Sequence, residues 1–176
     1  MRYFGSALRF GATASFCFIL GGAAEAGAST YVLTDASQLS EGCFELCACP
    51  QWEAGVVGSF QLAPTGFDGS FEMFDVSEVH WTVLSPPIEV SGSGTYRIDR
   101  VAGVQRLELD LRRGPGDVEH FDSGLVVADV DFPAIHAEVA IHGSPACFDT
   151  RFELHAFPTV AVQDVNWSPI KAMYKR

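Results

Sequence analysis

Three segments alternate apolar and polar residues with a period of two, and this pattern constrains the fold more than any other feature of the chain. In segment 104–112 three leucines share one face, while charged side chains occupy the other. Segments 135–142 and 148–156 repeat the arrangement. A period of two with one apolar face is typical of antiparallel strands that turn one side to water. The pattern therefore predicts a sheet with a buried face and a solvated face.

Turn-forming residues divide the rest of the chain into further short apolar segments. Segment 31–34 is a short predicted strand, and 35–51 is expected to be a loop that holds a cysteine cluster. Asp68-Gly69 is a strong hairpin signal, and segment 88–98 is a glycine-dotted strand expected to bend at Gly92 or Gly94.

No segment has the capped 3.6-residue period of an amphipathic helix. We therefore predict an all-β antiparallel meander of about eight to ten strands, folded as a β-sandwich or as an up-and-down, lipocalin-like barrel. The expected organisation is a signal over residues 1–28, a single β domain over 29–165 and a basic tail over 166–176.

The N-terminus has the order of a cleavable secretory signal. Two arginines precede an apolar run over 10–24, and small residues follow up to Ala28. Cleavage is expected after Ala26 or Ala28. A spanning helix needs roughly 20 apolar residues, and this run is shorter, so we expect no stable membrane span after cleavage. The mature protein is predicted to be secreted or periplasmic.

The mature chain is strongly acidic. Removal of residues 1–26 leaves 9 basic and 21 acidic residues, a formal charge of −12. This charge argues against nucleic acid and anionic membrane surfaces as partners, because both repel it. The expected partner is therefore an unknown small ligand or an envelope component. In outline, an exported barrel resembles the periplasmic lipocalin-like and isoprenoid-binding barrels; the resemblance is architectural and carries no site residue.

Four cysteines remain after the signal: Cys43, Cys47, Cys49 and Cys147. An even number in an oxidising compartment predicts disulfides. A bridge between Cys47 and Cys49 would be strained. We therefore expect Cys43 to pair locally with Cys47 or Cys49, and Cys147 to pair with a member of the cluster. The alternative is a zinc site that uses the four thiolates.

Histidines and a carboxylate gather on the polar face of two predicted strands. His136, Glu138 and His142 share the outward face of 135–142, and His155 lies outward on the following strand. If the two strands form a hairpin, His136 and His155 come near each other. Such a set can hold a divalent transition metal, whereas the alternative interpretation is a solvated polar face without a cofactor.

Other candidate sites carry weaker signals. Trp52, beside the cysteine cluster, is a candidate for stacking on a ligand. A carboxylate-rich stretch offers a possible calcium site without the spacing of an EF-hand; it comprises Asp117, Glu119, Asp122, Asp129 and Asp131. No nucleophile elbow is present, and the sequence contains no convergent catalytic set.

Three hypotheses for function follow. The leading one is a non-enzymatic exported module that binds a ligand or partner and is stabilised by disulfides. The second is a metal-dependent enzyme that uses the histidine and glutamate strand face. The third is a structural envelope or surface protein.

Overall fold

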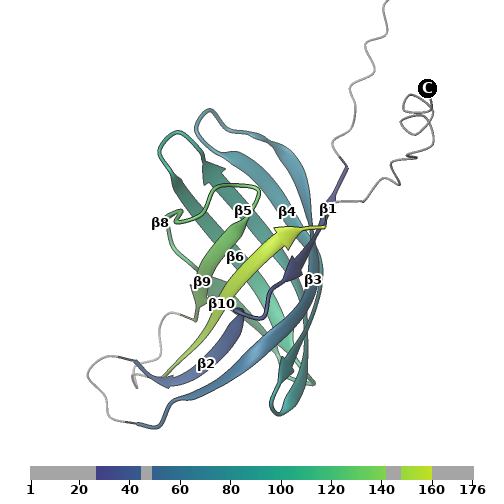
Figure 1. The fold of residues 1–176 in the computed structure, drawn as a ribbon, viewed down its shortest axis with the longest axis vertical. Helices are drawn as coiled ribbons and strands as arrows, with labels where there is room; N and C mark the ends of the chain where they lie inside the picture. Colours follow the sequence, from purple (N-terminus) through teal and green to yellow (C-terminus); the bar gives the residue numbers. More distant parts are fainter. Residues whose placement is uncertain (1–26, 45–48, 142–147, 160–176) are drawn as a thin grey trace, which may run out of the picture.

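A computed structural model describes residues 27–44, 49–141 and 148–159 (Figure 1). The expected signal lies almost wholly outside these residues, as does the basic tail. The described chain forms ten antiparallel strands, mostly in meander order. They are β1 (Ser29–Leu33), β2 (Gln38–Cys43), β3 (Trp52–Phe67), β4 (Glu72–Leu84), β5 (Pro87–Asp99), β6 (Val104–Arg113), β7 (Val118–Asp122), β8 (Val126–Val127), β9 (Ile135–Ala140) and β10 (Phe148–Pro158).

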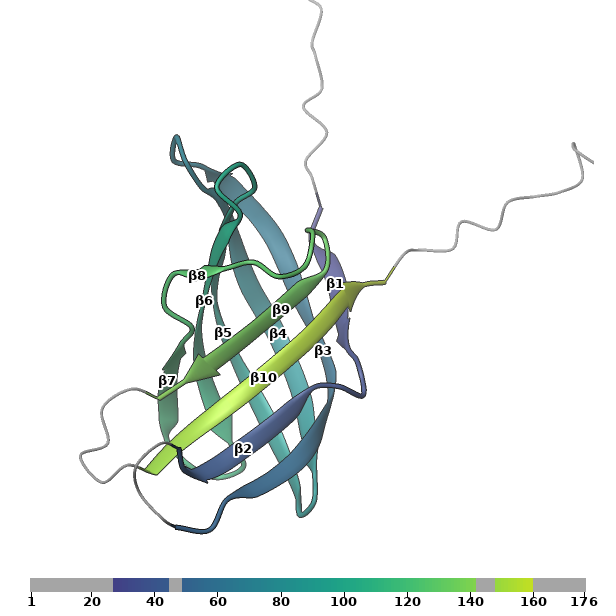
Figure 2. The same ribbon diagram turned by 60° about the vertical axis from the view of Figure 1, so that its left-hand side comes forward.

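Hydrogen bonds close eight of these strands into a near-barrel, so the predicted all-β fold class is confirmed. The ring runs from β2 through β7 in sequence order, continues to β9 and β10, and returns to β2. Figure 2 shows β10 lying between β9 and β2. Of the predicted alternatives, the barrel describes this closure better than two separate sheets do. Among the described residues, no helix is long and apolar enough to cross a membrane.

Strands β1 and β2 share one position in the ring. β1 pairs with the end of β10 and with the middle of β3, whereas β2 pairs with the first half of β10 and the start of β3. β1 and β2 therefore follow each other along one strand position of the ring, and the connection between them is a break in that position. The last described strand lies beside the first two.

The barrel interior is filled by side chains. The inward leucines of β6 are buried, as the alternation predicted, and so are the inward residues of β9 and those of β10 from Thr150 onward, whereas Phe148 at the start of β10 is 48% exposed. Large aromatic side chains occupy the centre: Trp81, Phe121 and Phe152 are at most 1% exposed, and the Phe152 ring packs 5.2 Å from that of Phe121. An eight-stranded ring is just wide enough to be filled in this way. The candidate site described below lies on the outer wall of the barrel.

The predicted loop over 35–51 is wrong for residues 38–43, which form β2. These residues pair with β10 on one side and β3 on the other, and Leu39 and Cys43 are buried. The segment is polar and contains glycine, so its local strand propensity is low. Pairing with two neighbours and burial of one face override that propensity.

Local chemistry explains the other irregularities. The carboxylate of Asp68 accepts hydrogen bonds from the backbone of Ser70 and Phe71, which forms the predicted hairpin turn. Segment 88–98 lies within β5, and a Cβ on Gly92 or Gly94 would lie 2.2 or 2.0 Å from a carbonyl oxygen of β6. These glycines let the two backbones approach closely where the sheet coils.

A disulfide joins Cys43 to Cys49, with their Cα atoms 5.4 Å apart. This is one of the two local pairs that the spacing favours. It ties the end of β2 to the residues just before β3. A four-thiolate zinc site is excluded by this bridge. Cys47 and Cys147 lie outside the described residues, so the long-range pairing stays a prediction.

Candidate functional site

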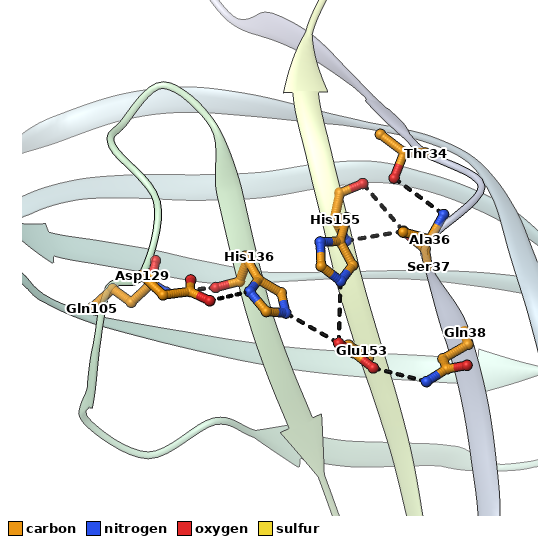
Figure 3. A network of polar contacts seen from close by, with 9 residues as sticks. All are labelled: Thr34, Ala36, Ser37, Gln38, Gln105, Asp129, His136, Glu153 and His155. Atoms are coloured by element: carbon orange, nitrogen blue, oxygen red, sulfur yellow. Dashed lines mark hydrogen bonds and ion pairs between the residues drawn. The ribbon is translucent and has the colours of Figure 1, made fainter.

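The antiparallel register of β9 and β10 places His136 directly opposite His155. Their imidazole rings stack, with centroids 3.9 Å apart and planes 19° apart. Both side chains lie on the outer face of the barrel and are about a quarter exposed. The hairpin arrangement expected from the alternation therefore brings two histidines from different strands into contact (Figure 3).

Glu153 completes a three-residue cluster. Its carboxylate oxygen Oε1 lies 3.2 Å from Nε2 of His136 and 3.2 Å from Nε2 of His155. One ligand atom from each residue lies within 4.8 Å of the other two. Ligands bound to zinc at 2.0–2.1 Å in a tetrahedron are about 3.3–3.4 Å apart. The two nitrogen-to-oxygen distances are therefore close to the edges of such a tetrahedron.

Each of the two ring nitrogens of His136 faces a carboxylate. Nδ1 lies 2.5 Å from Asp129, and Nε2 faces Glu153. An ionised carboxylate only accepts hydrogen bonds, and a neutral imidazole has a single N–H to donate. One of the two contacts therefore requires a second proton or a cation. If Nδ1–H donates to Asp129, Nε2 presents its lone pair toward the cluster.

Buried polar side chains fix the backbone of both histidines. The hydroxyl of Ser37 donates to the carbonyl of His155 at 3.1 Å and accepts from its N–H at 2.9 Å. It does so where the connection from β1 to β2 interrupts the strand. The amide of Gln105 donates to the carbonyl of His136 at 2.6 Å and accepts from the Tyr96 hydroxyl at 2.9 Å. At each histidine a side chain from a neighbouring segment thus takes part in hydrogen bonding to the strand backbone (Figure 3).

An open pocket of about 340 Å³ adjoins the cluster. Within the described residues, β7 and β9 pair only at Asp122 and Ala140, and the wall opens beyond that pair. The pocket is lined by Gln105, Ser123, Val126, Val127, Asp129, His136, Ala137, Glu138 and Glu153. It combines a carboxylate-rich wall with an apolar one, and its volume is at the lower end for small-molecule sites.

The Glu153 carboxyl is ionised at neutral pH. Burial acts to raise its pKa, but hydrogen bonds from His155, Gln38 and His136 together hold the pKa below its ordinary value. The amide of Gln38 donates to its second oxygen at 2.8 Å. A charged carboxylate whose position is fixed by a neighbouring amide is suited to bind a cation.

The other predicted metal ligands are placed differently. Glu138 lies opposite Glu153 in the register and lines the pocket, and its carboxylate pairs with Arg151 at 3.3 Å. His142 lies outside the described residues. Metal binding by His136, Glu138, His142 and His155 stays a prediction. Of these four residues, His136 and His155 are in contact with each other.

The remaining candidates are dispersed. Trp52 begins β3, is half-buried and packs against the core; its role in ligand binding stays a prediction. In the carboxylate-rich stretch, Asp122 pairs with Arg106 and Glu119 pairs with Arg113, while Asp129 contacts His136. These carboxylates are engaged by different partners.

Sequence reasoning did not select Glu153 or Asp129 for the histidine cluster. Glu153 and His155 are two residues apart on one outward face, so the signal for Glu153 was present in the alternation. Asp129 lies in the irregular segment after β8, and no periodicity predicts where its carboxylate points.

Comparison with known protein families, with curated proteins and with solved structures finds no match to this chain.

Proposed function

We propose that this protein is an exported β-barrel that binds a divalent transition metal at His136, Glu153 and His155. The observation that carries the proposal is the convergence of two imidazole nitrogens on one carboxylate oxygen, each at 3.2 Å. Two histidines and one glutamate are a common zinc-binding set. Nitrogen and oxygen donors together favour zinc, copper or iron over calcium.

Asp129 supports the proposal as an outer partner of the site. A metal-binding histidine usually donates its second N–H to a carboxylate or carbonyl, which orients the ring and raises its basicity. The 2.5 Å contact between Nδ1 of His136 and Asp129 has this form. A cation at the cluster would also replace the protons that the two Nε2 atoms otherwise donate to Glu153.

Titration of the purified mature protein with Zn²⁺ in a calorimeter tests the proposal. We expect one Zn²⁺ per chain. Single changes His136→Ala, His155→Ala and Glu153→Gln should weaken binding by more than the roughly 10- to 100-fold expected on loss of an outer partner. Asp129→Asn should fall within that range.

His80→Ala is the matched control, since His80 is an exposed histidine on β4, a different strand. Its Zn²⁺ affinity should equal that of the wild type. Absence of stoichiometric Zn²⁺ binding, or equal losses in His80→Ala and His136→Ala, would contradict the proposal.

Export is proposed from the N-terminal signal, and the fold is compatible with its removal. Ser29 begins β1 and pairs with Leu62, so cleavage after Ala26 or Ala28 leaves every described strand intact. N-terminal sequencing of the mature protein tests this proposal. A first residue of Gly27 or Ser29 is expected, and a chain that retains Met1 would contradict it.

A further inference from the structure

We infer that the C-terminal segment 160–176 binds back to the outer wall of its own barrel, across an exposed apolar stripe on β10, β1, β3 and β4. The inference is independent of the proposed metal site. Four outward side chains form the stripe: Phe157, Val32, Val57 and Leu84. Exposed apolar side chains that lie singly are ordinary, whereas a contiguous group of them is typical of a surface that binds another segment or molecule.

The strand register makes the stripe continuous. Phe157 on β10 lies directly opposite Val32 on β1. Val57 is the diagonal neighbour of Val32 on β3, and such neighbours are about 7–8 Å apart. Two residues further along β3, the side chain of Leu84 covers Gly55, where a Cβ would lie 3.3 Å from its Cδ1 atom. The stripe thus crosses four adjacent strands without a charged residue between its members.

The described chain ends beside the first members of this stripe. Thr159 follows Phe157 by two residues, and its N–H donates to the carbonyl of Thr30 on β1 at 2.7 Å. The stripe is about 20 Å long, from the spacings of strand neighbours. Residues 160–176 can span up to roughly 56–61 Å when fully extended. The segment is therefore long enough to turn back and follow the whole stripe.

The distribution of charge favours this segment as the occupant. Both lysines of the chain, Lys171 and Lys175, lie within the last six residues, together with Arg176. β1, β3 and β4 contain no lysine or arginine. Two exposed carboxylates border the stripe, Glu53 on β3 and Glu89 on β5. A basic segment is therefore attracted to this wall.

A second copy of the barrel is a poorer occupant. Each mature chain has a formal charge of −12, so two barrels repel each other. The C-terminal segment carries its own apolar side chains beside its basic ones: Val160, Val162, Val165, Trp167, Ile170, Met173 and Tyr174. Burial of these side chains against the stripe and attraction to its acidic border therefore act together.

Methyl NMR of the full mature chain, with an uncharged gadolinium chelate in solution, tests the inference. In the described barrel Val57 and Val126 are 39% and 38% exposed, and Leu84 and Leu125 are 51% and 57% exposed, so each pair is a matched comparison. The methyl groups of Val57 and Leu84 should be relaxed several-fold less than those of Val126 and Leu125, because segment 160–176 covers them. Equal relaxation within each pair overturns the inference.

Reversing the charge of the segment identifies the occupant. In the triple variant Lys171→Glu, Lys175→Glu and Arg176→Glu, the chelate should relax the methyl groups of Val57 and Leu84 as strongly as those of their matched partners. The urea midpoint should keep its wild-type value, because a terminal segment on the outer wall detaches before the strands unfold. Protection that persists in this variant overturns the inference. Protection that the wild type loses on dilution assigns the stripe to a second copy and also overturns it.

Discussion

The two edges of strand β9 differ in how they are paired. Toward β10, six residue pairs hold the strands in register. Toward β7, the described residues form a single pair, between Asp122 and Ala140. The continuous edge aligns His136 with His155, and the interrupted edge opens the pocket beside them. The proposed metal site would use both features, because its ligands are aligned by continuous pairing and reached through a gap.

The largest effect should come from disrupting the core beneath the continuous edge. Phe152 on β10 is fully buried, and its ring lies 5.8 Å from that of Trp81. Phe152→Ala should lower the free energy of unfolding by about 3–5 kcal/mol, because it removes a large buried side chain and leaves a cavity. Urea denaturation measures the loss.

Phe157→Ala is the matched control for this change, since Phe157 lies on the same strand but is 54% exposed. It should change stability by less than about 0.5 kcal/mol. Similar urea midpoints for the two variants would show that β10 does not depend on the core beneath it.

A smaller effect is expected at the interrupted edge. Gln105→Leu leaves the carbonyl of His136 and the hydroxyl of Tyr96 without the partners they have in the native protein. Each unsatisfied buried group costs about 1–3 kcal/mol, and Zn²⁺ affinity should fall as His136 loses its support. Urea denaturation and calorimetry measure the two changes.

Adding Tyr96→Phe to Gln105→Leu should restore part of the stability, because it removes one of the stranded groups. The double variant therefore tests coupling between the two side chains. Strictly additive losses would mean that Gln105 does not bridge Tyr96 to β9.

The smallest effect concerns the single β7–β9 pair at acid pH. The bidentate hydrogen bonds from Arg106 to Asp122 lower the pKa of this carboxyl; partial burial opposes them, and the N–H of Gly124 adds to them. The stabilisation is fully present above the unfolded-state pKa of about 3.9. It is lost as pH falls through the lower folded-state pKa.

Asp122→Asn should therefore flatten the decline of unfolding free energy between about pH 5 and pH 2. At neutral pH it should cost less than about 1 kcal/mol, because the ion pair is partly exposed and screened. Asp117→Asn, in the exposed turn before β7, is the control. Identical pH profiles for Asp122→Asn and the wild type would contradict the assignment.

Much of the barrel could be predicted from the alternation. The inward leucines of β6 and the apolar face of β9 follow from period two alone. β2 could not be predicted, because Gln38–Cys43 becomes a strand through its two neighbours and not through its own composition. Closure into a ring likewise depends on which distant strands meet, and local pattern carries no information about that.

The candidate site was partly predictable for the same reason. His136 and His155 were identified because both lie outward on strands that a short turn would pair. Glu153 lies on the same outward face as His155, but the alternation does not distinguish it from the other polar residues of that face. The position of Asp129 could not be predicted from the sequence, because the pairing of Val127 with Val104 sets the path of its segment.

The place of β10 between β1 and β2 has a consequence for how the chain is made. A ribosome delivers β1 and β2 first and β10 last, so these N-terminal strands can pair with β3 early but lack β10, their second partner, until residue 158 has been synthesised. Pairing between such distant segments is slow to form. The topology would thus delay closure of the ring until the C-terminal strand is available.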